Sequence, residues 1–177
     1  MHVSKRKGLA LLVCAAFAGS AFSAVGAFGH GLQIPIFQPR VHEVLKSDLI
    51  GNNNTDPAIH GVSTAPASWK IAFGRIHVFS NGGVIVVIRG LLITGTGTAA
   101  DNTVGPVQKV DAALFCGNDT KAAAMTKSVP LSPQGDALMV DKVILPARCL
   151  APQVLINPTV GGNIIPIYIA ASGFITM

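Results

Sequence analysis

From Ser68 to the C-terminus, short apolar stretches alternate with turn residues at near-regular spacing. Residues 69–79 alternate in hydrophobicity, with a change of phase at Gly74 that suggests a β-bulge. Asn81-Gly82-Gly83 then predicts a tight turn, because these residues tolerate positive φ. The β-branched run Val84 to Ile88 follows, so the two segments predict a β-hairpin whose second strand is central and covered on both faces.

The rest of this region has the same organisation. Turns are predicted at Ser132 to Gly135 and at Gly161 to Asn163. No amphipathic helix of ordinary length is evident. We therefore expect an all-β fold, an antiparallel β-sandwich of immunoglobulin-like or jelly-roll-like type with seven to eight strands. The further expected strands are 91–94, 107–116, 122–129, 137–145, 153–156 and 164–174.

The N-terminus has the features of a secretory signal peptide. A basic start, Lys5-Arg6-Lys7, precedes an uncharged apolar run from Leu9 to Phe22, and small-x-small cleavage sites follow up to Gly29. The alternative is a retained membrane anchor, since 8–28 approaches the length of a spanning helix. If the signal peptide is cleaved, we expect a secreted, periplasmic or cell-envelope protein.

This gives three parts: a signal peptide at 1–27, an irregular segment at 28–67 and a β-sandwich domain at 68–177. The irregular segment contains four prolines and the run Gly51 to Asn54. Val41 to Ile50 within it fits either a short helix or an edge strand, because its pattern matches neither period.

Two cysteines remain after cleavage, since Cys14 is removed with the signal. Cys116 and Cys149 form an even pair in an exported chain, which predicts one disulfide. Two free thiols would suit a cytosolic protein better. A metal site is disfavoured because no histidine lies near either cysteine in the sequence.

The charge of the chain argues against two classes of partner. Of 13 Lys and Arg, three lie at positions 5–7, so ten Lys and Arg and eight acidic residues remain after cleavage, a formal charge of +2. No basic block survives, so neither nucleic acid nor anionic lipid is supported as a partner.

The remaining histidines are the candidate metal ligands. Cleavage after Gly29 would make His30 the N-terminal residue, and a terminal histidine offers an amine and an imidazole nitrogen to one ion. A second histidine, from His42, His60 or His77, would complete a three-nitrogen site that suits copper(II).

A mature chain that begins His30-Gly31 on a secreted β-sandwich resembles, in that respect only, copper-dependent polysaccharide monooxygenases and periplasmic copper-binding sandwiches. The resemblance implies a copper ligand at His30 alone. Aromatic residues make up only 6% of the chain, with one Trp and one Tyr, so a flat sugar-binding surface is not expected. Cleavage at an earlier site would leave His30 in a loop.

Enzymatic motifs are weak. The chain has no Gly-x-Ser-x-Gly elbow. Ser80, His77 and Asp111 can be named as a triad, but any chain of this size offers such a choice. The stretch Gly95 to Thr98 is glycine-rich, but no helix is expected after it, which disfavours a phosphate loop. We therefore assign no catalytic residue.

The expected function is an exported, non-enzymatic domain with a binding or structural role in the cell envelope or the extracellular space. The alternative is a copper-binding secreted protein. Self-association through the edges of apolar strands, Val84 to Ile88 or Ile164 to Ile169, is a third hypothesis. Burial of both strands in the interior is the competing interpretation, which we favour.

Overall fold

The structure is a computed structural model that describes residues 40–173. These residues form fourteen β-strands and no helix. Within this range, no helix long and apolar enough to cross a membrane is found. The strands are β1 (Glu43–Gly51), β2 (Ser63–Thr64), β3 (Ser68–Lys70), β4 (Phe73–Phe79), β5 (Gly83–Arg89), β6 (Leu92–Thr94), β7 (Lys109–Phe115), β8 (Ala124–Met125), β9 (Val129–Pro130), β10 (Ala137–Lys142), β11 (Gln153–Val160), β12 (Asn163–Ile164), β13 (Ile167–Tyr168) and β14 (Ala170–Gly173).

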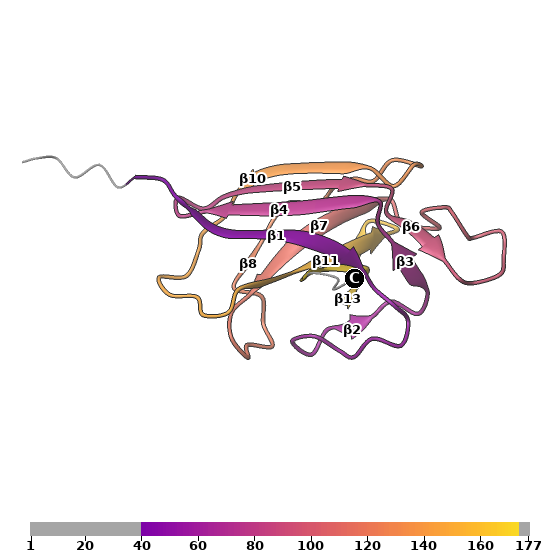
Figure 1. Cartoon of the computed structure of the whole chain (residues 1–177), viewed down its shortest axis with the longest axis horizontal. Helices are drawn as coiled ribbons and strands as arrows, with labels where there is room; N and C mark the ends of the chain where they lie inside the picture. Colours follow the sequence, from indigo (N-terminus) through magenta and orange to yellow (C-terminus); the bar gives the residue numbers. More distant parts are fainter. Residues whose placement is uncertain (1–39, 174–177) are drawn as a thin grey trace, which may run out of the picture. The chain divides into compact units, whose positions relative to one another are not determined.

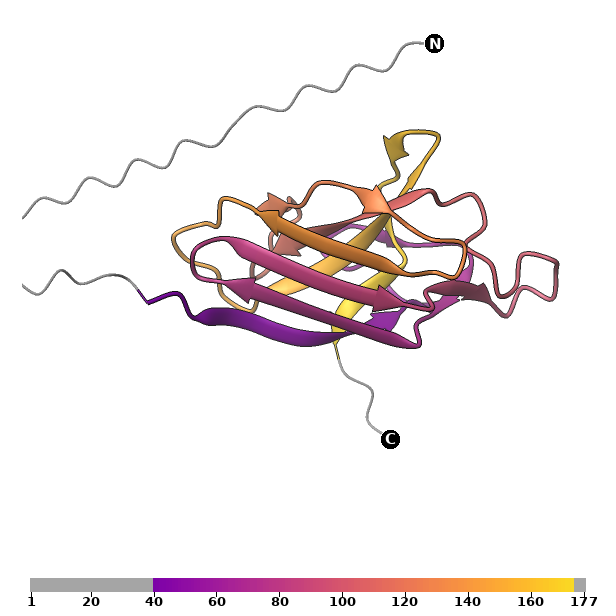
Figure 2. The same cartoon turned by 90° about the horizontal axis from the view of Figure 1, so that it is seen from above.

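Ten strands belong to one sheet with the order β10-β5-β4-β1-β14-β11-β7-β8, to which β12 adds beside β11 and β9 beside β7. The sheet curls into a half-barrel, so that β10, β5, β4 and β1 lie over β7, β8 and β11 (Figure 1). Figure 2 shows the sheet from above, with β10, β5, β4 and β1 side by side and nearest the viewer. The all-β, mostly antiparallel architecture is thus confirmed, whereas the sandwich type and the count of seven to eight strands are not.

The predicted hairpin is present as β4 and β5, but residues 69–79 are not one strand with a bulge at Gly74. Ser68–Lys70 forms β3, which pairs with β6, and β4 pairs with β5 in continuous register through Gly74. The hairpin strands pair from Phe73 opposite Arg89 to Val78 opposite Val84, and Gly82 in the turn has a φ of 84°. A side chain at Gly82 would collide with the carbonyl oxygen of Val143. The turn therefore requires glycine both for its backbone conformation and for the close approach of the loop after β10.

The position of β5 in the sheet is as predicted, but its burial differs. The strand lies between β10 and β4, so it is not a sheet edge. Val84, Val86 and Ile88 are buried, whereas Ile85 and Val87 on the opposite face are only half-buried. The prediction of a strand covered on both faces is therefore wrong: β5 has the alternating burial of a sheet with one face on the core.

Strand β1 resolves the ambiguity at 41–50. It is neither a helix nor an edge strand, because it pairs with β4 on one side and with β14 on the other. The expected boundary at residue 68 does not coincide with the start of the sheet, since β1 precedes it. The register shifts between Glu43 and Leu45, and the half-buried Ser47 lies between Leu45 and the buried Leu49, which obscured the alternation.

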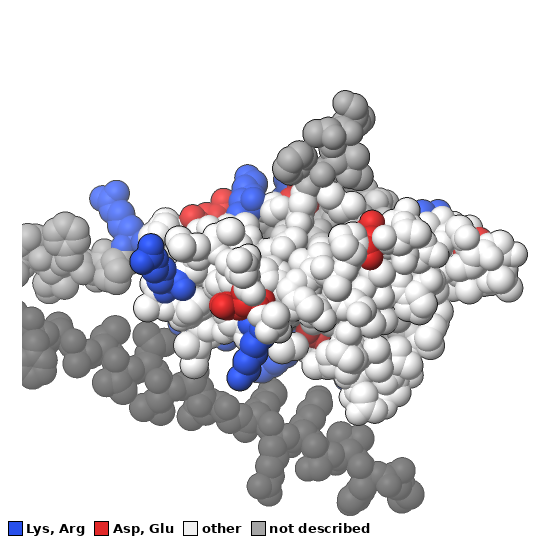
Figure 3. Space-filling model, turned by 90° about the horizontal axis from the view of Figure 1, so that it is seen from below, with Lys and Arg blue, Asp and Glu red and all other residues white. Residues whose placement is uncertain are grey.

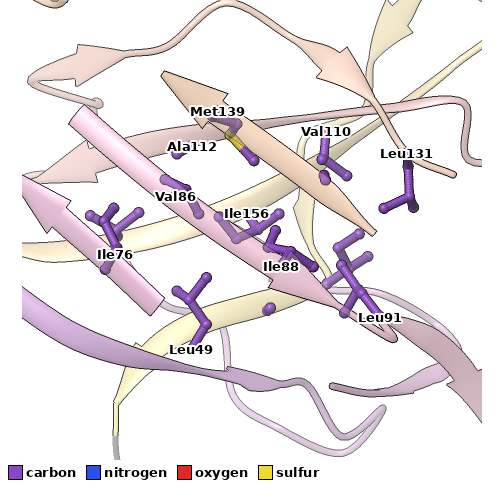
Figure 4. Packing of buried hydrophobic residues seen from close by; sticks show 14 of the residues in the cluster. Leu49, Ile76, Val86, Ile88, Leu91, Val110, Ala112, Leu131, Met139 and Ile156 are labelled. Carbon is purple, nitrogen blue, oxygen red and sulfur yellow. The ribbon is translucent and has the colours of Figure 1, made fainter. Parts of the chain in front are cut away.

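The main core fills the inside of the curl. Ile76, Val86 and Ile88 from the upper strands face Val110 and Ile156 from the lower strands (Figure 4). All five are at most 1% exposed. Branched aliphatic side chains from both halves of the sheet therefore hold the halves together.

A second, smaller cluster lies on the opposite face of β7 and β11. It consists of Ala113, Phe115, Leu155 and Tyr168. The Tyr168 hydroxyl donates a hydrogen bond of 2.8 Å to the carbonyl oxygen of Pro57, which holds the segment before β2 against this face. Strands β7 and β11 are consequently buried on both faces, unlike β5.

The predicted disulfide is present between Cys116 and Cys149, with Cα atoms 5.0 Å apart. Cys116 directly follows β7, and Cys149 lies in the loop that leads from β10 to β11. The bridge therefore fixes this long loop to the end of β7. A disulfide is compatible with an oxidising compartment such as the periplasm or the extracellular space.

The turn predicted at Ser132 to Gly135 connects β9 to β10. Gly135 has a φ of 81°, and its carbonyl oxygen accepts a hydrogen bond of 3.0 Å from the Leu91 amide. A Cβ atom at Gly135 would lie 2.5 Å from both the nitrogen and the oxygen of Leu91. The close contact between these two backbones therefore depends on glycine.

Candidate functional site

The histidines proposed as copper ligands are dispersed. His30 lies outside the described residues. The His42 ring contacts the carbonyl oxygen of Arg40, and the His77 ring pairs with Glu43 through Nδ1. His60 stacks on Phe115 at 4.7 Å between ring centroids. Among residues 40–173, no group of three or more His, Cys, Asp or Glu side chains could hold a metal ion.

Ser80, His77 and Asp111 do not form a triad. The Ser80 hydroxyl accepts a hydrogen bond from the His42 amide, and no hydrogen bond joins Ser80 to His77. Asp111 lies on the face of β7 turned away from the main core, where it is fully buried. Since the three side chains have separate partners, the arrangement offers no activated hydroxyl.

Asp111 is a structural group with an unusual environment. Its Oδ2 accepts a hydrogen bond of 3.1 Å from the Asn157 side-chain amide directly across the strand pair, whereas its Oδ1 has no partner among the described residues. Burial raises the pKa of the Asp111 carboxyl, and the Asn157 bond only partly opposes this.

The glycine-rich stretch Gly95 to Thr98 is not available as a phosphate loop. The Asp101 carboxylate accepts hydrogen bonds of 2.9 Å from the amides of both Thr96 and Gly97. These bonds, with the bond from the Thr96 hydroxyl, lower the pKa of Asp101. The amides that would bind a phosphate are thus occupied by a carboxylate of the same loop.

The feature most suited to binding is an apolar groove at the end of the half-barrel where β1 begins. It has a volume of about 420 Å³, within the range of small-molecule pockets. Its walls come from β1, β4, the end of β7 and the loop between β10 and β11. The lining residues are Val44, Leu45, Val78, Ser80, Leu114, Leu145, Pro146, Ala147, Cys149 and Pro152.

The disulfide holds the loop that forms one wall of this groove. Cys149 itself lines the groove, and its bridge to Cys116 connects the loop to β7. The Gly117 amide adds a hydrogen bond of 2.6 Å to the Leu150 carbonyl oxygen. Pro146 and Pro152 further restrict the backbone on either side of the bridge. The groove is therefore largely preformed.

Several charged residues lie close in sequence to those that line the groove. Arg40, Lys142 and Arg148 lie within four residues of a lining residue, and none forms an ion pair with a described residue. Two acidic side chains nearby, Glu43 and Asp141, accept hydrogen bonds. Glu43 pairs with the His77 ring, and the Asp141 carboxylate accepts hydrogen bonds from the backbone amides of Lys127 and Lys142, which lower its pKa. Among these side chains, Arg40, Lys142 and Arg148 outnumber the Glu43 and Asp141 carboxylates by three to two.

Sequence reasoning missed the groove. Its walls come from segments separated by up to about 100 residues, and no motif in any one of them signals a pocket. Only the disulfide, which predicts that the loop before β11 is fixed to the end of β7, could have drawn attention to this region.

No protein-family model matches the chain, and searches of curated proteins and of solved structures found no match.

Proposed function

We propose that the protein is an exported, non-enzymatic binding domain whose ligand occupies the apolar groove beside the disulfide. The observation that carries this proposal is a preformed groove of about 420 Å³ walled mainly by aliphatic residues and prolines. Such a surface binds apolar ligands by removing them from water.

A binding role fits the chemistry of the groove better than catalysis. Ser80 is the one hydroxyl residue among the ten that line it, and its oxygen already accepts the His42 amide. The lining contains no histidine, carboxylate or lysine. The groove thus offers contact area for a ligand and lacks a group that could exchange a proton with it.

Export supports the same role, through the signal features of residues 1–27 and the Cys116–Cys149 bridge. We also propose that the domain behaves as a β-sandwich whose two layers are the halves of the one curled sheet. The packing of Ile76 and Val86 from one half against Val110 and Ile156 from the other supports this description.

The test uses a neutral fluorescent probe, N-phenyl-1-naphthylamine, whose emission rises in apolar pockets. Ala147 is exposed and lines the groove, so Ala147→Phe should fill it without disturbing the core. Ala99→Phe, in an exposed loop, is the matched control. We expect saturable binding to the purified protein that Ala147→Phe weakens about tenfold or more and Ala99→Phe leaves unchanged. Equal binding by both variants would refute the proposal.

A further inference from the structure

We infer that the natural ligand of the groove is a single-chain amphiphile with an anionic head group, of the chemical class of a long-chain fatty acid. This inference rests on the proposed function, because it assigns a ligand class to the same groove. It adds two requirements: a flexible hydrocarbon chain and a negative charge at one end.

The walls favour a hydrocarbon chain over a ring or a sugar. None of the ten lining residues is aromatic, so the groove has no flat face on which a sugar or an aromatic ring could stack. Val44, Leu45, Val78, Leu114 and Leu145 instead present branched aliphatic groups. These groups pack well against methylene groups, which can adapt to an irregular surface.

The apolar surface continues beyond the groove. Ile144 and Leu150, in the loop that walls it, are 91% and 61% exposed. Val41 and Val44, at the start of β1, are 56% and 45% exposed. Exposed aliphatic side chains gathered at one end of a small domain indicate a contact surface for an apolar partner. They would cover the part of a chain that the groove does not enclose.

The charges around the groove favour an anionic head. Arg148 lies between the lining residues Ala147 and Cys149, Arg40 lies three residues before β1, and Lys142 is the last residue of β10. Figure 3 shows that most of the Lys and Arg side chains visible from below lie at its left, the end at which β1 begins in Figure 1, with Asp and Glu side chains among them. Since Arg40, Lys142 and Arg148 outnumber the Glu43 and Asp141 carboxylates, the balance of charge in this group complements an anion.

Chain length is the first test. Isothermal titration calorimetry of the purified protein with octanoate, laurate and palmitate, each as monomer, should show affinity rising about fourfold per added methylene until the groove is full. An affinity independent of chain length would overturn the inference.

Charge is the second test. Arg148→Glu should weaken laurate binding by up to about fivefold at low salt and leave binding of the neutral dodecanol unchanged. Lys109→Glu is the matched control, because it makes the same change of charge at an exposed residue at the start of β7. It should alter the binding of neither laurate nor dodecanol. Equal binding of laurate by Arg148→Glu and the unchanged protein would overturn the anionic head group.

The outcomes separate this inference from the proposed function. If dodecanol binds as well as laurate and only Ala147→Phe weakens both, the anionic assignment fails while the binding groove stands. If Ala147→Phe affects no ligand, both proposals fail. Sedimentation with anionic phosphatidylglycerol vesicles without binding of monomeric laurate would replace the inference with docking to a lipid surface.

Discussion

Removal of the Cys116–Cys149 bridge should lower the free energy of unfolding by an amount that follows from the chain itself. The bridge joins residues 33 apart, and the chain-entropy relation for a loop of this size gives about 4 kcal/mol at 25 °C. For a domain of the described size, this corresponds to a fall in Tm of roughly 13 °C. The physical reason is that the crosslink restricts the unfolded chain more than the folded one.

Urea unfolding followed by circular dichroism would measure this difference, with the oxidised protein compared with the same protein under reductant. The m-value should increase on reduction, because an unfolded chain without the crosslink exposes more surface. Combined Cys116→Ala and Cys149→Ala substitutions provide a second route to the same state. Their stability should agree with that of the reduced protein to within about 1 kcal/mol, since the two differ only in the volume of two small side chains.

A loss below about 1 kcal/mol on reduction would refute the reasoning, because it would mean that the bridge does not constrain the unfolded chain. A large loss with an unchanged m-value would also contradict it. That result would place the effect in the folded state, in the loop between β10 and β11.

Three further predictions concern other parts of the chain. Gly135→Ala should destabilise by more than the roughly 1–2 kcal/mol expected for Gly161→Ala, which has a similar positive φ but nothing within 4 Å of the added Cβ; equal losses in urea unfolding would contradict this. Because burial raises the Asp111 pKa, the folded protein binds this proton more tightly than the unfolded chain, so stability falls as pH rises from the ordinary value of 3.8 through the folded-state pKa. Asp111→Asn should remove this fall in stability with rising pH. If the variant and the unchanged protein have the same pH profile of unfolding, Asp111 is not the group responsible. N-terminal sequencing of exported protein tests the copper hypothesis: only a chain that starts at His30, and loses copper(II) binding in His30→Ala, would support it.

The hairpin shows how far local sequence determines this fold. Asn81-Gly82-Gly83 and the alternating residues around it predicted the turn and the two strands that pair across it, because each depends on neighbours along the chain. The split of residues 69–79 into β3 and β4 depends on the distant partner β6 and was not predicted. The burial of β5 depends instead on whether a second layer covers its outer face, and the β-branched run at 84–88 carries no information about that. The prediction for that face was therefore wrong.

Strand β1 and the groove illustrate the opposite limit. The register shift near Glu43 and the half-buried Ser47 are compatible with a strand only once β4 and β14 flank it. The groove needs Val44, Leu114 and Leu145 to meet, although they come from three distant segments. The pairing of Cys116 with Cys149 was the one long-range contact predictable from sequence, because only two cysteines remain after cleavage.

Strand β7 has a consequence for how the domain opens. Val110 and Ala112 on one side belong to the main core, and Ala113 and Phe115 on the other belong to the smaller cluster. Neither cluster can be exposed to solvent without disturbing this shared strand, so the two should unfold as one cooperative unit. Amide protons of β7 and β11 should accordingly exchange with deuterium most slowly, and at a common rate set by global unfolding.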